Sequence, residues 1–174
     1  MKKLLYRLTA VLLLLGVFSF SSLVPQAAAS QPTLLEFNTM VGVPRPYTGL
    51  ANAIRGIPGG GFPWVISFGS GELTASGKLE VKVTGLVLDP NDPAVIAAGL
   101  AGKNPIPNFK AIVSCLSKDA AGNPTTANVS SGLFPADSSG NAEIETTLSL
   151  PSPCIAPIVF VTSPGGAWFA ATGK

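Results

Sequence analysis

Short runs of alternating apolar and polar residues, separated by glycine and proline, constrain the fold of this chain most. The clearest run is KLEVKV at residues 78–83, where Leu79, Val81 and Val83 alternate with charged residues. A period of two places the apolar side chains on one face of a β-strand. The chain also contains 19 Gly and 16 Pro, which between short apolar runs are typical of turns joining strands. The sequence therefore predicts an all-β fold.

The same pattern predicts about eight strands in total. The run 158–161 is apolar on both faces, as in a central strand whose outer side is covered. The other expected strands are residues 49–57, 64–75, 109–116, 126–134, 142–150 and 167–172. Antiparallel hairpins of this length favour a two-sheet β-sandwich, Ig-like in general architecture. A closed barrel is the alternative, because periodicity does not distinguish the two.

One segment, residues 89–108, interrupts the regular succession of predicted strands. Asp92 is placed to cap a short helix whose first residue is Pro93 and which stops at Gly102. We expect the apolar side of this helical insertion to cover the outer face of a sheet.

The first thirty residues have the pattern of an export signal. Lys2, Lys3 and Arg7 precede an apolar run, and small residues end it, so cleavage is expected near Ala29 and Ser30. A membrane-tethered protein with an uncleaved signal is the alternative. The expected organisation is a signal peptide at 1–30, an extended lead-in at 31–46 and a β-sandwich domain at 47–174.

Removing the signal also changes the charge balance. The chain has 11 Lys and Arg against 9 Asp and Glu, and three of the basic residues leave with the signal. The remainder has no basic excess with which to bind nucleic acid or anionic lipid. It also contains no second apolar run of the roughly 20 residues that cross a bilayer. We expect a secreted protein, extracellular or periplasmic.

Cys115 and Cys154 are the only cysteines, and the chain has no histidine. An oxidising compartment favours a disulfide between them, and two reduced core cysteines are the alternative. Without histidine the chain has no Ser-His-Asp or Cys-His catalytic arrangement, and it lacks the commonest zinc ligand. No cofactor is expected.

Carboxylates supply the weak candidates for catalysis and for metal binding. Glu143 and Glu145 project from the same face of one predicted strand, about 7 Å apart, near the range of a glycosidase pair. A solvated outer face is the simpler interpretation. Asp89, Asn91 and Asp92 offer oxygen ligands for calcium, but a turn and a helix cap account for the same residues without a metal.

Aromatic side chains are the best candidates for a binding surface. Trp168 and Phe169 are adjacent on a strand, so their rings point to opposite faces and at most one enters the core between the sheets. Trp64 lies beside Pro63, and Tyr47 lies in a proline-rich loop. Exposed aromatic residues stack on sugars or anchor a partner protein. Packing against the core is the alternative.

Three segments carry a resemblance to known proteins. IRGIPGGGFPW at 54–64, NPIPNFKAIVSCLS at 104–117 and PCIAPIVFVTSPGGAWFAATG at 153–173 resemble an uncharacterised family of exported bacterial single-domain β proteins. The resemblance covers the chain from about Phe37 onward. It implies no activity and no catalytic residues.

The sequence as a whole favours a secreted, non-catalytic β-sandwich with a binding or structural role at the cell surface or outside the cell. The partner would be a cell-wall glycan or a surface protein. The alternative is a secreted carbohydrate-active hydrolase that uses carboxylates.

Overall fold

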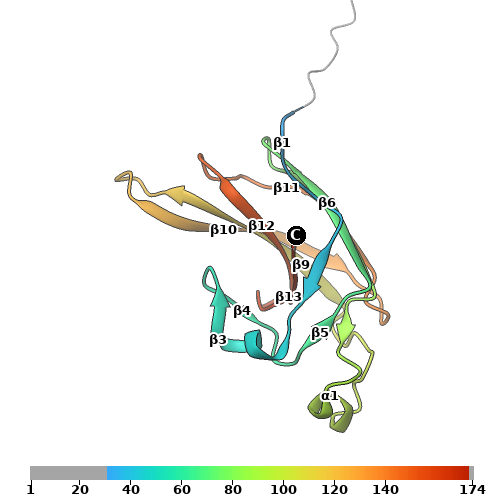
Figure 1. Ribbon diagram of the computed structural model, residues 1–174. Helices are drawn as coiled ribbons and strands as arrows, with labels where there is room; N and C mark the ends of the chain where they lie inside the picture. The colour runs from blue at the N-terminus through green and yellow to red at the C-terminus, as the bar shows by residue number, and fades with distance from the viewer. Residues whose placement is uncertain (1–30, 173–174) are drawn as a thin grey trace, which may run out of the picture.

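The structure is a computed structural model that describes residues 31–172. The predicted signal segment, residues 1–30, and its cleavage site lie outside the described residues. The regular secondary structure of the described chain is almost all β, and its sheets pack against each other (Figure 1). This confirms the all-β, sandwich-like fold with one short α-helix.

The smaller of the two main sheets has four antiparallel strands. Their order is β1 (Thr33–Phe37), β6 (Phe68–Thr74), β7 (Lys78–Thr84) and β11 (Ala142–Thr147). In β7 the residues Leu79, Val81 and Val83 are buried while Lys78 and Lys82 are exposed, as the alternation predicts.

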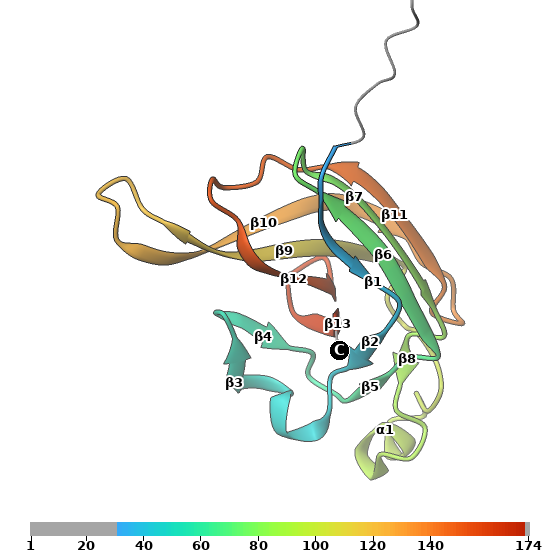
Figure 2. The same cartoon turned by 45° about the horizontal axis from the view of Figure 1, so that its top comes forward.

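The larger sheet has seven strands and curves around the core (Figure 2). Its order is β10 (Pro124–Pro135), β9 (Asn108–Lys118), β12 (Ile155–Thr162), β13 (Trp168–Thr172), β4 (Ile57–Gly59) and β3 (Gly49–Ile54), and β2 (Met40–Gly42) also pairs with β13. The two-stranded ladder of β5 (Trp64–Val65) and β8 (Val87–Leu88) completes the fold.

The segment interpreted as an extended lead-in contributes two strands. β1 pairs with β6, β2 pairs with β13, and Phe37 and Met40 are buried in the core. The folded part of the chain therefore begins before residue 47. Five-residue and three-residue strands are too short to show a clear period, so the sequence did not distinguish them from a linker.

Two predicted strands divide into pairs of shorter ones. Residues 49–57 form the β3–β4 hairpin, whose turn residues Arg55 and Gly56 both have positive φ angles, 50° and 78°. This is the combination that tight hairpin turns require. Residues 64–75 become β5 and β6, which belong to different sheets.

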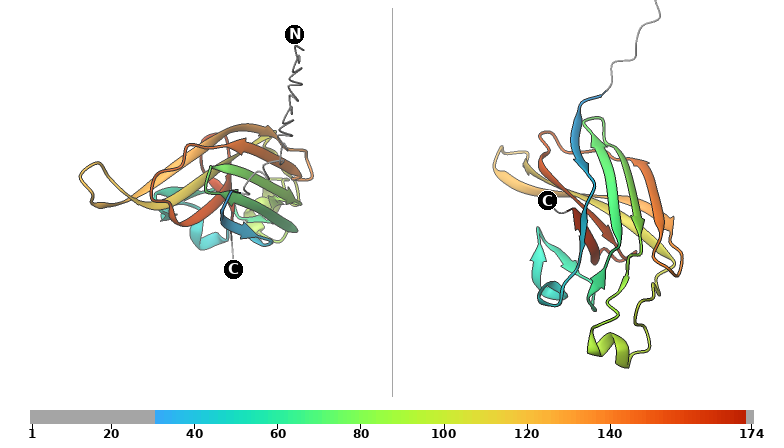
Figure 3. Two further views of the ribbon diagram at one scale, coloured as in Figure 1. Left: turned by 90° about the horizontal axis from the view of Figure 1, so that it is seen from above. Right: turned by 45° about the vertical axis from the view of Figure 1, so that its right-hand side comes forward.

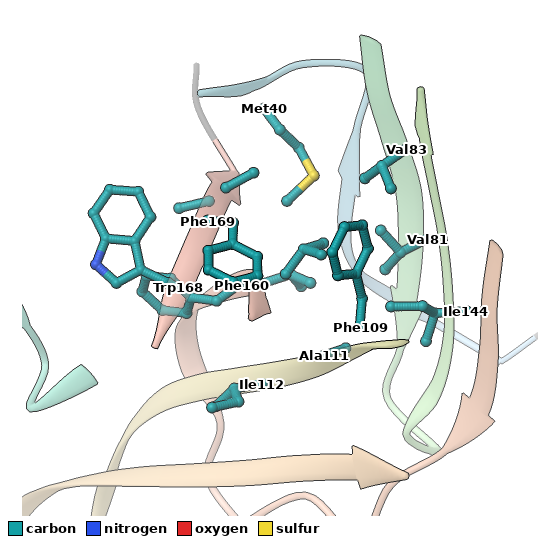
Figure 4. Packing of buried hydrophobic residues seen from close by; sticks show 14 of the residues in the cluster. Met40, Val81, Val83, Phe109, Ala111, Ile112, Ile144, Phe160, Trp168 and Phe169 are labelled. Carbon is teal, nitrogen blue, oxygen red and sulfur yellow. The ribbon is translucent and has the colours of Figure 1, made fainter. Parts of the chain in front are cut away.

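The core lies between the two main sheets. Phe109 of β9 is fully buried and lies between Val81 and Val83 of β7 and the ring of Phe169, at 5.8 Å between ring centroids (Figure 4). The predicted central strand is also confirmed, because Val159, Phe160 and Val161 of β12 are fully buried on both sides of the sheet.

The β3–β4 hairpin, at the end of the larger sheet, folds back against the other strands of the same sheet. Arg55 Nη1 donates to the carbonyl oxygens of Ser114, at 2.8 Å, and Ala156, at 2.9 Å. The side-chain amide of Asn128 donates in turn to the Arg55 carbonyl oxygen, at 3.0 Å. These bonds join the hairpin to β9, β10 and β12.

The helix α1 (Pro93–Ala97) begins as predicted. Asp92 accepts hydrogen bonds from the backbone N–H groups of Ala94 and Val95, and Pro93 occupies the first position. The helix stops earlier than expected, at Gly99 with φ 71°, where a residue without a side chain is favoured. It lies at one end of the sandwich beside β5 and β8 (Figure 2), and not over the outer face of a sheet.

Helices are otherwise scarce in the described part. The remaining one is the 3-10 turn η1 (Arg45–Tyr47). Within residues 31–172, neither helix has the length and apolar character needed to cross a bilayer.

Two turns of identical chemistry enclose β10. The segments 119–123 (DAAGN) and 137–141 (DSSGN) each close around an aspartate. Asp119 accepts from the backbone of Ala121 and Asn123, and Asp137 accepts in the same way from Ser139 and Asn141. In both turns the donated hydrogen bonds, first of all that of the asparagine backbone N–H, lower the pKa of the aspartate.

The disulfide between Cys115 and Cys154 is confirmed, with a Cα–Cα distance of 4.9 Å and a separation of 39 residues. It joins Cys115 of β9 to Cys154, the residue just before β12. Strands β9 and β12 are neighbours in the larger sheet. The bridge therefore reinforces the larger sheet and does not connect the two sheets.

Replacing both cysteines with alanine should lower the free energy of unfolding by about 4 kcal/mol, because the unfolded chain regains the freedom of a long loop. Urea unfolding measures the change. Adding reductant to the wild-type protein should bring its transition close to that of the double variant. A change below about 1 kcal/mol would contradict a stabilising role for this bridge.

The turn aspartates should titrate below the ordinary aspartate value of about 3.9. Because their folded pKa values are depressed, their contribution to stability is complete above that value and is lost as the pH falls through the folded pKa values. NMR titration of the carboxyl carbons measures both midpoints. Asn141→Ala should raise the midpoint of Asp137 and leave that of Asp119 unchanged; equal shifts at both would contradict this account.

Candidate functional site

Two of the four predicted binding aromatics lie in the core. Trp64 and Phe169 are each 4% exposed, and their rings stack with centroids 3.9 Å apart. The ring of Phe109 lies edge-on to both. These side chains pack the interior and form no part of an exposed surface.

Trp168 lies on the opposite face of β13 from Phe169, as strand alternation predicts. Its ring contacts Phe160 at 6.0 Å and Tyr47 at 6.4 Å between centroids, and Figure 4 shows it pointing away from Val81 and Ile144. It is only 3% exposed, because η1 and the β3–β4 hairpin cover this side of the sheet. Its buried indole N–H has no hydrogen-bond partner among the described residues.

An apolar cleft opens between this covering segment and the larger sheet. Its volume is about 220 Å³, and we call it the Tyr47 cleft. It is lined by Val41, Pro44, Tyr47, Ile54, Trp168, Ala171 and Thr172. Two of the four aromatics predicted for binding, Tyr47 and Trp168, therefore meet at one site.

Backbone geometry fixes the position of Tyr47. Prolines at positions 44 and 46 favour the tight turn η1, and the Thr48 hydroxyl donates to the Arg45 carbonyl oxygen at 2.8 Å. Gly59 passes so close beneath this turn that a Cβ atom there would lie 1.9 Å from the Tyr47 carbonyl oxygen. Only glycine allows this approach.

The rim of the cleft exposes apolar side chains to solvent. Tyr47 is 41% exposed and Val41 is 56% exposed, while the neighbouring strand β3 carries Leu50 at 82%. Contiguous exposed apolar residues of this kind mark interaction sites more often than single ones do. Sequence reasoning identified Tyr47 and Trp168 but missed Val41, because it lies in the segment interpreted as a lead-in.

The candidate catalytic residues Glu143 and Glu145 lie on a different surface, the outer face of the four-stranded sheet. Glu145 pairs with Glu80 across the strands, Glu80 with Glu72, and Glu72 with Glu36. One glutamate from each of the four strands thus forms a line, which we call the glutamate row. The row and Glu143 line an open groove of about 430 Å³.

Two lysines offset part of this negative charge. Lys82 Nζ lies 2.9 Å from a carboxylate oxygen of Glu143, and Lys78 is ion-paired with Glu80. The Thr33 hydroxyl donates to Glu72 at 2.5 Å. In glycosidases the two carboxylates face each other across a cleft that holds the substrate. Here the glutamates all project from one face of a sheet.

The residues suggested for calcium already have structural partners. Asp89 accepts from the Asn91 backbone N–H at 2.9 Å, and Asp92 caps α1 and is ion-paired with Arg45. The Arg45 hydrogen bond is the main cause of the lowered pKa of Asp92. Among residues 31–172 no group of three potential ligands of the His, Cys, Asp or Glu type is arranged to hold a metal ion.

Comparison with known proteins gives no relative for this chain. No family model, no curated protein and no solved structure matches it. The resemblance to exported bacterial proteins therefore stays a prediction, and the site rests on its geometry alone.

The glutamate row should cost stability, because like charges directly opposite on neighbouring strands repel each other. We expect Glu145→Gln to raise the free energy of unfolding by about 0.2–1 kcal/mol. The gain should shrink as salt screens the repulsion. Glu143→Gln is the matched control, since it removes the partner of Lys82 and should give no gain. Equal effects of both variants in urea unfolding would contradict a specific repulsion along the row.

Proposed function

We propose that this protein is a non-catalytic binding module that works outside the cytoplasm, extracellular or periplasmic, and that the Tyr47 cleft is its binding site. The observation that carries this proposal is an open apolar cleft with exposed apolar residues at its rim. The disulfide is compatible with an oxidising compartment of that kind.

The lining of the cleft favours a protein partner over a glycan. Apart from Thr172, the Tyr47 hydroxyl and the Trp168 indole N–H, its side chains are apolar. A sugar bound there would leave most of its hydroxyl groups without hydrogen-bond partners, at a cost of about 1–3 kcal/mol each. An apolar side chain of a surface protein fills a cleft of this size without that cost.

The alternative, a carbohydrate-active hydrolase that uses Glu143 and Glu145, has less support. Glu143 is ion-paired with Lys82, and both glutamates project from the margin of an open sheet face. A general acid in a glycosidase needs a raised pKa, which enclosed apolar surroundings provide. Neither glutamate is enclosed, since both are exposed to solvent.

Backbone and indole NMR resonances can test the cleft with small probes. We expect N-acetyl-leucinamide and N-acetyl-tryptophanamide to shift the amide signals of Val41 and Ala171 and the indole N–H signal of Trp168. The indole of Trp64, which does not line the cleft, should stay in place. Chitotetraose serves as the glycan probe and should shift none of these signals.

Tyr47→Ala should remove the response to both amide probes, because it deletes one wall of the cleft. Ile96→Ala is the matched control, since Ile96 is 54% exposed on α1 and lies outside the cleft. Shifts with chitotetraose alone would favour the glycan interpretation. Hydrolysis of an oligosaccharide that is lost in Glu143→Gln or Glu145→Gln would overturn the non-catalytic assignment.

A further inference from the structure

The two main sheets have margin strands, and these strands differ in how they are protected from pairing with another chain. The strand order leaves β1 and β11 at the margins of the four-stranded sheet, and β10 and β3 at those of the larger sheet. A margin presents unpaired backbone N–H and C=O groups, which bind any strand that reaches them. Proteins usually protect such margins with charges, short strands or irregular pairing.

Three of these margins carry such protection. β1 has Glu36, and β11 has Glu143 and Glu145. β3 is six residues long and its register with β4 is irregular between Gly49 and Ile54. The exposed charges on β11, which sequence reasoning considered for catalysis, thus have a structural role at a sheet margin.

β10 has no comparable protection. It is the longest strand in the described chain, with 12 residues, and no charged residue occurs between Pro124 and Pro135. Residues 124–130 pair with β9 one for one, and the bulge comes only after Ser130. Figure 3 shows the β9–β10 hairpin projecting from the body of the sandwich, so its margin is accessible.

We propose that β10 is a self-association site, at which two copies of this protein pair antiparallel through residues 124–130. The dimer would have a two-fold axis at Ala127 and would join the two larger sheets edge to edge.

The chemistry of this segment is complementary to itself about Ala127. In the antiparallel register centred there, Thr125 of one copy lies opposite Val129 of the other, a pairing of two β-branched residues. Thr126 lies opposite Asn128, a pairing of two polar residues on the face where Asn128 also donates to the Arg55 carbonyl oxygen. Because neither pair contains a charge, the two-fold arrangement brings no like charges together along the strand.

The proposed contact is small, so the dimer should be weak. Pairing of seven residues from each copy falls below the area of a standard stable interface. We expect a dissociation constant between about 10 μM and 1 mM. Association of this strength appears only at high local concentration of the protein.

Sedimentation equilibrium of the purified protein should give a monomer–dimer equilibrium in this range. Thr126→Lys places two ammonium groups diagonally across the axis and should weaken association at least about tenfold. Ser139→Lys adds the same charge to an exposed position of the 137–141 turn and should leave the dimer intact. Thermal unfolding of both variants at low concentration verifies that they are folded.

Hydrogen exchange identifies the contact without any substitution. At concentrations above the dissociation constant, the outward N–H groups of residues 124–130 should become protected, while those of β3 should not. A wild-type protein that stays monomeric up to about 1 mM would overturn the proposal. So would a dimer that persists in Thr126→Lys, or one whose protection lies on another strand.

Discussion

Burial of the central strands of the larger sheet, β9, β12 and β13, on both faces is the constraint on which the rest of this structure depends. Their inner face forms the core with the four-stranded sheet, and the β3–β4 hairpin at the end of the same sheet folds back over their outer face. Arg55 holds this hairpin in place through backbone carbonyls of β9 and β12. The Tyr47 cleft exists because the covering segment does not close completely over β13 and β2.

The outer faces of the two main sheets differ in charge. The glutamate row and two lysines gather on the outer face of the four-stranded sheet, which therefore remains solvated. In the larger sheet the outer face around Trp168 is packed, and the exposed residues lie on β10, at the start of β12, on β3 and around Val41. Both proposed interaction sites lie on this sheet.

Features that depend on near neighbours in the sequence were predictable. The alternation in β7 and the Asp92 cap follow from local chemistry. The disulfide follows from the presence of only two cysteines, which can pair in one way. The glutamate row was not predictable, because it depends on the register of four strands separated by many residues. The burial of Trp168 was one of two alternatives from the sequence, since alternation gives its face but not what covers that face. The repeated D-x-x-G-N segments were visible in the sequence and identify the two turns that enclose β10.

The first of these turns also explains how a long, uncharged strand stays in one register with β9. A strand of polar and small residues has little hydrophobic pattern to fix its pairing, so a slip by one residue costs little in burial. Asp119 and Asp137 each close a turn at one end of β10 with hydrogen bonds to fixed backbone positions. The Asp119 turn, which closes the β9–β10 hairpin, therefore supplies the register that the side chains of β10 do not, while the Asp137 turn leads on to β11 of the other sheet. The pairing of β10 with β9 is regular between Pro124 and Ser130, and a regular margin is the form that another strand can pair with.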